Sequence, residues 1–129
     1  MLPAHDIAYL NDRFCESNYT LVKDGGVVCV LVPGYTLPFG YNRERADLML
    51  RLQTGYPDTP PDMWWFEPAI LKANNSPIPQ ADVNEVHLGR RWQRWSRHLC
   101  PGAWRSGIDG LESFFAILDK DLANWAGGV

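Results

Sequence analysis

The sequence predicts an α+β fold, in which one antiparallel sheet carries helices on one side. Three observations lead to this class. Strand-like segments follow one another in the first half of the chain, one helix pattern precedes them, and another ends the sequence. With 129 residues, 46% hydrophobic and 21% charged, the chain has the size and composition of a single globular domain spanning residues 1–129.

Two segments carry the spacing of an amphipathic helix. In residues 4–15, apolar side chains from Ile7 to Phe14 recur at helical intervals. The second pattern is longer, and Asp109 with Glu112 three residues later resembles a capping box at its start. Its apolar face consists of Leu111, Phe114, Phe115, Leu118, Leu122 and Trp125.

Four strands are expected between these helices, paired in sequence order as a meander. Residues 19–23 and 27–32 flank an aspartate and two glycines, which are typical of a hairpin turn. Residues 46–53 alternate leucines with other side chains, as a half-buried strand does. The aromatic segment 63–66 is the fourth strand, and the stretch between it and the last helix, rich in proline and turn residues, is expected to be irregular.

Charge and cysteine content exclude several classes of protein. The net charge of −3 argues against binding polyanions through bulk charge. The longest apolar run, residues 27–32, is far shorter than the ~20 residues that span a bilayer, and no secretion signal is visible. Three cysteines without a CxxC pair indicate a reducing compartment. We therefore expect a cytoplasmic protein with no metal site, no cofactor and no membrane partner.

Residues 48–66 resemble the ubiquitin-conjugating enzymes. In that family the third strand runs into Tyr-Pro, Pro-Pro follows, and the fourth strand opens with an aromatic residue. Here these positions are Tyr56-Pro57, Pro60-Pro61 and the aromatic strand. The prolines restrict the backbone, so that the chain passes from one strand to the next along a defined path.

A second block, residues 89–111, looks like the bacterial group called prokaryotic ubiquitin-conjugating enzyme family E. Trp104 matches the tryptophan that precedes the crossover helix in the eukaryotic enzymes. The resemblance implies the ubiquitin-conjugating fold, with a ubiquitin-like protein and an activating enzyme as partners. It also implies an activity, in which the modifier's C-terminus is accepted from the activating enzyme and passed to an amine.

The candidate acceptor is Cys100, although the chain lacks the His-Pro-Asn of the eukaryotic enzymes and Cys100 lies only four residues before Trp104. Nearby cations favour the thiolate that such a relay needs. Ser96, with His98 as its base, is the candidate for an oxyester relay. A purely structural role remains open for each of these residues. In that interpretation Cys100 fills a turn, Ser96 caps a turn, and His98 bonds to a loop carbonyl. A non-catalytic adaptor that binds the activating enzyme or the modifier is the second reading of the chain.

Five arginines near the acceptor predict a local positive face. Three interpretations of such a face are open. It is a solvated surface, a docking site for an acidic partner, or a patch that binds single-stranded nucleic acid through arginines interleaved with tryptophans. Docking of a protein partner is favoured over nucleic acid. The proline-rich hinge, residues 56–61, is expected to add to the same partner surface. The partner-binding residues are then Arg90, Arg91, Arg94, Arg97, Tyr56, Pro57, Pro60, Pro61 and Trp104, with Arg105 as the fifth arginine.

Overall fold

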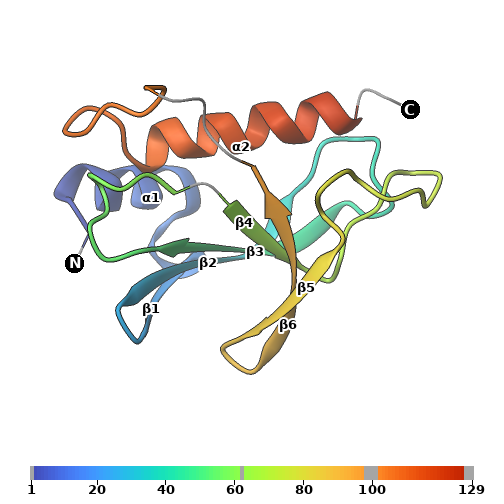
Figure 1. Ribbon diagram of the computed structural model, residues 1–129, viewed down its shortest axis with the longest axis horizontal. Coiled ribbons are helices and arrows are strands. Elements are labelled where there is room, and N and C mark those ends of the chain that lie inside the picture. The colour runs from blue at the N-terminus through green and yellow to red at the C-terminus, as the bar shows by residue number, and fades with distance from the viewer. Residues whose placement is uncertain (1, 62, 98–101, 127–129) are drawn as a thin grey trace.

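The computed structural model describes residues 2–61, 63–97 and 102–126. In this part of the chain the fold is α+β, as expected, with two α-helices and a six-stranded sheet (Figure 1). The elements are α1 (Ala4–Phe14), the short 3₁₀ helix η1 (Glu16–Asn18), β1 (Thr20–Asp24), β2 (Val27–Thr36), β3 (Arg45–Leu52), β4 (Met63–Glu67), β5 (Val83–His87), β6 (Arg90–Ser96) and α2 (Leu111–Ala126).

The strands pair antiparallel throughout, in the order β1-β2-β3-β4-β6-β5. The first four strands follow one another as predicted, but the expectation of a four-stranded sheet is wrong. Residues 83–96, which were expected to be irregular, form the β5–β6 hairpin, and β6 pairs with β4. The arginines of β6 make this strand difficult to predict, because their charges are balanced by carboxylates that lie elsewhere in the sequence.

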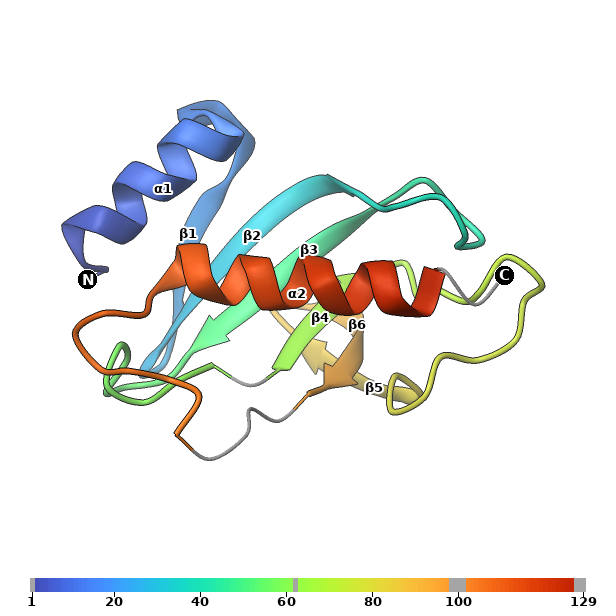
Figure 2. The same ribbon diagram turned by 90° about the horizontal axis from the view of Figure 1, so that it is seen from above.

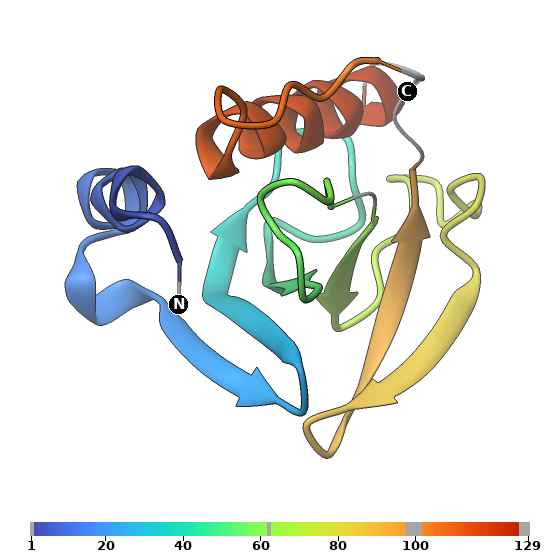
Figure 3. The same cartoon turned by 60° about the vertical axis from the view of Figure 1, so that its left-hand side comes forward.

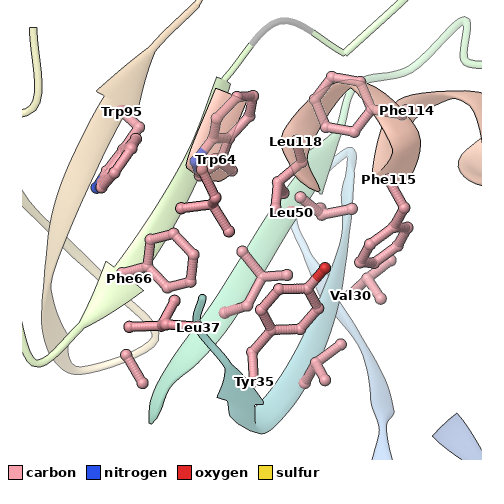
Figure 4. Close-up of a cluster of buried hydrophobic side chains, with 14 of the residues drawn as sticks. Val30, Tyr35, Leu37, Leu50, Trp64, Phe66, Trp95, Phe114, Phe115 and Leu118 are labelled. Atoms are coloured by element: carbon pink, nitrogen blue, oxygen red, sulfur yellow. The ribbon is translucent and has the colours of Figure 1, made fainter. Parts of the chain in front are cut away.

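One face of the sheet is covered by α2 (Figures 1 and 2). Alternate strand residues point toward this helix, so the leucines of β3, Trp64 and Phe66 of β4 and Trp95 of β6 are all buried beneath it. Figure 4 shows these side chains meeting Phe114, Phe115 and Leu118 of α2. The apolar stripe predicted for the last helix is therefore the lid of the main core.

No helix covers the opposite face among the described residues (Figure 3). A smaller cluster lies there, made of Cys29, Met49, Trp65 and Trp92. Charged side chains surround it. Arg51 donates to Asp24 at 2.8 Å, and Arg90 bonds to Asp47 at 2.8 Å and also to Glu67.

α1 lies beside the beginning of α2 (Figure 2). Leu10 is fully buried in the main core, and the rings of Tyr9 and Phe14 pack 5.7 and 5.4 Å from that of Phe115. Both helices therefore reach the end of the sheet from which the β3–β4 loop projects.

Candidate functional site

The β3–β4 loop contains the predicted hinge. The Tyr56–Pro57 peptide bond is cis, and the loop closes on itself because Tyr56 N–H donates to Gln53 O and Thr59 N–H to Gly55 O. Gly55 has φ 101°, and a Cβ there would lie 2.9 Å from Thr59 Oγ1. Glycine is therefore required at this turn.

The hinge is bonded to the segment that leads into α2. Trp104 Nε1 donates to Pro57 O at 2.8 Å, and the rings of Tyr56 and Trp104 lie 6.4 Å apart. Two residues later Ser106 Oγ bonds to Asp58. The Tyr-Pro loop and the tryptophan that carried the family resemblance thus form one contact, although they are far apart in sequence.

Asp6 joins this contact to both helices. Its side chain is fully buried and accepts hydrogen bonds from Tyr56 Oη at 2.7 Å and from Leu111 N–H at 2.9 Å. Burial and the bond to Asp6 raise the pKa of Tyr56, so its hydroxyl remains a donor. A Cβ on Gly110 would lie 2.6 Å from Asp6 Oδ1, so this close approach requires glycine.

The start of α2 is capped differently from the sequence expectation. The carboxylate of Asp6, from α1, accepts from the first N–H of the helix, where unpaired donors and the helix dipole favour a negative charge. Asp109 instead holds the preceding loop, accepting from Arg105 N–H at 2.6 Å and from Ser113 Oγ at 3.0 Å. The Arg105 backbone bond first, and then Ser113 and the Arg105 side chain, lower the pKa of Asp109.

Arg97 holds the chain as it leaves β6. Its Nε donates to Asp121 of α2 at 2.8 Å, and its guanidinium lies 5.1 Å from the ring centre of Trp95. Both side chains of this ion pair are mostly buried. Residues 98–101, which contain the candidate acceptor, follow Arg97 in the sequence and precede the segment of Trp104.

Two of the three predicted catalytic residues, His98 and Cys100, lie outside the described residues. Ser96 is half-buried at the end of β6, opposite Met63 of β4, and its N–H donates to Gln80 O at 3.0 Å. The other two cysteines lie elsewhere. Cys29 is fully buried, which raises the pKa of its thiol, and Cys15 is exposed after α1.

The arginines do not form the single positive face that the sequence suggests. Because side chains alternate along β6, Arg90 and Arg94 lie on the face opposite α2, whereas Arg97 packs against α2. Four of the five bond to carboxylates, and Arg91 is exposed. Trp92 and Trp95 are fully buried and cannot stack on bases, which removes the argument for nucleic acid.

Glu85 is the centre of a polar cluster on that opposite face. It accepts from Trp65 Nε1 at 2.9 Å and from Arg94 at 2.7 Å, and His87 Nε2 lies 3.0 Å away. Burial alone would raise the pKa of Glu85, but the bonds from His87, Trp65 and Arg94 outweigh it and hold the pKa below its ordinary value. A hollow of about 380 Å³ lies beside this cluster and reaches Pro60 and Pro61, the first exposed and the second buried.

Comparison with known families shows which family the chain belongs to. The sequence pattern of prokaryotic E2 family E matches residues 2–125. The chain belongs to this family. Its members are ubiquitin-conjugating-like proteins of bacteria, and the matched residues include the hinge, Trp104 and nearly all of α2.

No curated protein and no solved structure matched the chain significantly. Neither described helix is long and apolar enough to cross a membrane. Within the same residues, no group of three or more His, Cys, Asp or Glu side chains is arranged to hold a metal ion.

Three aspartates that the sequence did not mark as site residues bond the hinge and the segment before α2 to their neighbours: Asp6, Asp58 and Asp109. Asp6 lies 50 positions from the tyrosine it accepts from and 105 from Leu111. No local motif connects residues at such separations. The one available signal was an aspartate in the first turn of a helix, which is common on helices of any function.

Proposed function

We propose that this E2-like protein is the carrier of a bacterial ubiquitin-like conjugation pathway. It accepts the modifier's C-terminus from an activating enzyme on Cys100 and transfers it to an amine. The observation that supports this most directly is the pair of anchors on either side of the acceptor span, Arg97–Asp121 and Trp104–Pro57. A relay needs an exchangeable acyl group at a reproducible position, and these two bonds hold the described residues that precede and follow Cys100 in the chain.

The chemistry is two acyl transfers. The Cys100 thiolate attacks the thioester carbonyl carbon of the loaded activating enzyme, a new C–S bond forms, and the activating enzyme's thiolate leaves. An amine then attacks the same carbonyl carbon, an amide bond forms, and Cys100 leaves as thiolate while the amine gives up a proton. We propose His98 as the group that takes this proton.

The partner surface in this proposal is the hinge end of the molecule. Tyr56, Pro57, Pro60 and Pro61 lie in one loop, and Trp104 is bonded to it. Of the arginines, Arg91 is exposed and available to an acidic partner, whereas Arg90, Arg94 and Arg97 already bond to carboxylates of this chain. We expect the reaction to take place in the bacterial cytoplasm, where a free thiol stays reduced.

The decisive experiment is a loading assay with the activating enzyme, ATP and the ubiquitin-like protein of the same pathway. We expect an adduct that thiol removes, that Cys100→Ala abolishes, and that becomes thiol-resistant in Cys100→Ser. Cys15→Ala is the matched control, because Cys15 is exposed and lies in another part of the chain, and this variant is expected to load normally.

Two outcomes would contradict the thioester relay. An adduct that persists in Cys100→Ala but is lost in Ser96→Ala, and that hydroxylamine releases, would indicate an oxyester relay. A stable complex with the activating enzyme or the modifier and no adduct in any variant would instead support the adaptor.

A further inference from the structure

The β2–β3 loop presents a phenylalanine entirely to solvent. Phe39 is 98% exposed, whereas Leu37 and Tyr41 on either side of it are buried. Figures 1 and 2 show this loop at the carboxyl end of α2, away from the hinge and from the segment that precedes the helix. A large aromatic side chain at such exposure gains none of the ~2 kcal/mol or more that burial would contribute.

The loop that carries Phe39 is firmly attached to the rest of the protein. Tyr41 Oη donates to Leu122 O at 2.6 Å, Asn42 N–H donates to Leu71 O, and Ala73 N–H donates to Gly40 O. Gly40 has φ 122°, and a Cβ on it would lie 2.6 Å from Ala126 O. Phe39 is therefore exposed in a loop conformation that these hydrogen bonds fix. Binding a partner here requires little ordering of the loop.

A hollow of about 500 Å³ lies within the same loop, lined by residues 36–45. Its charged side chains are Arg43, Glu44 and Arg45, a net positive set in a protein of net charge −3. Arg43 Nε is buried without a hydrogen-bond partner. Neither arginine is in a salt bridge with any described residue, unlike Arg90 and Arg94 of β6.

We propose that the Phe39 loop, residues 36–45, is a docking site for an acidic, partly apolar segment of a partner protein. A carboxylate of the partner enters the hollow and pairs with Arg43 and Arg45, and an apolar side chain packs on the ring of Phe39. An exposed aromatic beside unpaired arginines is the composition from which binding hot spots are made.

The charges of the loop decide between this partner and a second copy of the chain. Two copies that met through the same surface would bring four arginines together against two glutamates. An acidic segment relieves that repulsion, and it supplies the acceptor that Arg43 Nε lacks.

Binding of a designed probe tests the proposal. The probe is a short fluorescein-labelled peptide that alternates Asp and Glu with Leu and Phe, and its partner probe carries Lys at every acidic position. We expect the acidic peptide to bind by fluorescence anisotropy, more weakly at high salt, and the basic peptide not to bind. Phe39→Ser is expected to weaken binding about tenfold or more, and Arg45→Gln severalfold.

Two control variants remove similar groups elsewhere. Ile108→Ser changes a side chain that is 66% exposed near the other end of α2, and Lys23→Gln removes a cation of β1. Both are expected to bind the acidic peptide like the unchanged protein. Phe39→Ser is also expected to accept the modifier normally in the loading assay, which keeps this proposal separate from the one on Cys100.

Several results would overturn the proposal. They are equal binding of the acidic and basic peptides, no loss of binding in Phe39→Ser, or equal loss in Ile108→Ser. Concentration-dependent self-association in sedimentation that Phe39→Ser abolishes would assign the surface to a second copy. Binding to anionic vesicles but not to the acidic peptide would assign it to a membrane.

Discussion

Gln93 shows how one buried amide holds a long irregular connection to the sheet. Its Oε1 accepts from Ile70 N–H at 2.8 Å and from Trp95 Nε1 at 2.9 Å. Its Nε2 donates to Ile70 O at 2.9 Å and to Ala81 O at 2.8 Å. All four bonds are buried, and they occupy both N–H donors of the amide. Gln93 therefore has no free donor with which to stabilise the oxyanion of an acyl transfer.

Replacing Gln93 tests this role. We expect Gln93→Leu to lower the free energy of unfolding by about 3 kcal/mol or more, because several buried donors and acceptors lose their partners at once. Urea denaturation measures the difference. Gln53→Leu, at an exposed position in the β3–β4 loop, is the control and is expected to change stability by less than about 0.5 kcal/mol. Equal effects of the two variants would refute the structural role of Gln93.

At the scale of elements, the carboxylate of Asp6 joins α1, the β3–β4 loop and α2. It bonds to Tyr56 of the hinge and to the first N–H of α2, so the three elements share one buried carboxylate. Trp104 is bonded to the same loop. We therefore expect α1, the β3–β4 loop and the start of α2 to be energetically coupled.

A double-mutant cycle measures the interaction energy between Asp6 and Tyr56. We expect Tyr56→Phe to cost about 1–2 kcal/mol and Asp6→Asn a similar amount. The double variant should cost about 0.5 kcal/mol or more less than the sum, because the two groups share one bond. Tyr19→Phe is the control, since the Tyr19 hydroxyl bonds to Asn11 at an exposed position. Strictly additive effects would show that the Asp6–Tyr56 bond is energetically unimportant.

At the scale of the whole molecule, the two faces of the sheet are held differently. The face under α2 is packed with aliphatic and aromatic side chains, whereas the opposite face combines a small apolar cluster with charged hydrogen bonds. Glu85 is the acceptor of three of those bonds, and its pKa is lowered. Acid should therefore weaken the protein first through the uncovered face.

The pH dependence of unfolding follows from the sign of that shift. A carboxyl whose pKa is lower in the folded state stabilises the fold above its unfolded pKa of about 4.3, and this contribution is lost as the pH falls through the lowered value. We expect the stability difference between the unchanged protein and Glu85→Gln to be full at neutral pH and to shrink below about pH 4. Urea denaturation at several pH values measures it. Glu112→Gln, exposed on α2, is the control, and a difference that does not depend on pH would contradict the prediction.

The sequence was informative wherever a pattern is local. Both helices and the first four strands follow from periodicity and turn residues, and all were confirmed. The β5–β6 hairpin was missed because its arginines depend on distant partners, such as Asp47 and Glu67 for Arg90. The positive face expected from the sequence does not form, because four of its five arginines bond to carboxylates of this chain. Asp6 could not be selected because its partners lie 50 and 105 positions away.

The distribution of the six tryptophans has a practical consequence. Trp64, Trp65, Trp92 and Trp95 are sealed inside the molecule, so their emission should change little when a ligand arrives. Trp104 and Trp125 are half-buried, one bonded to the hinge and the other beneath Lys72 in the last turn of α2. With either of these two indoles changed to phenylalanine, the other becomes an intrinsic optical reporter for its own end of the protein. Events at the hinge and at the opposite tip can then be followed separately, without attaching a dye.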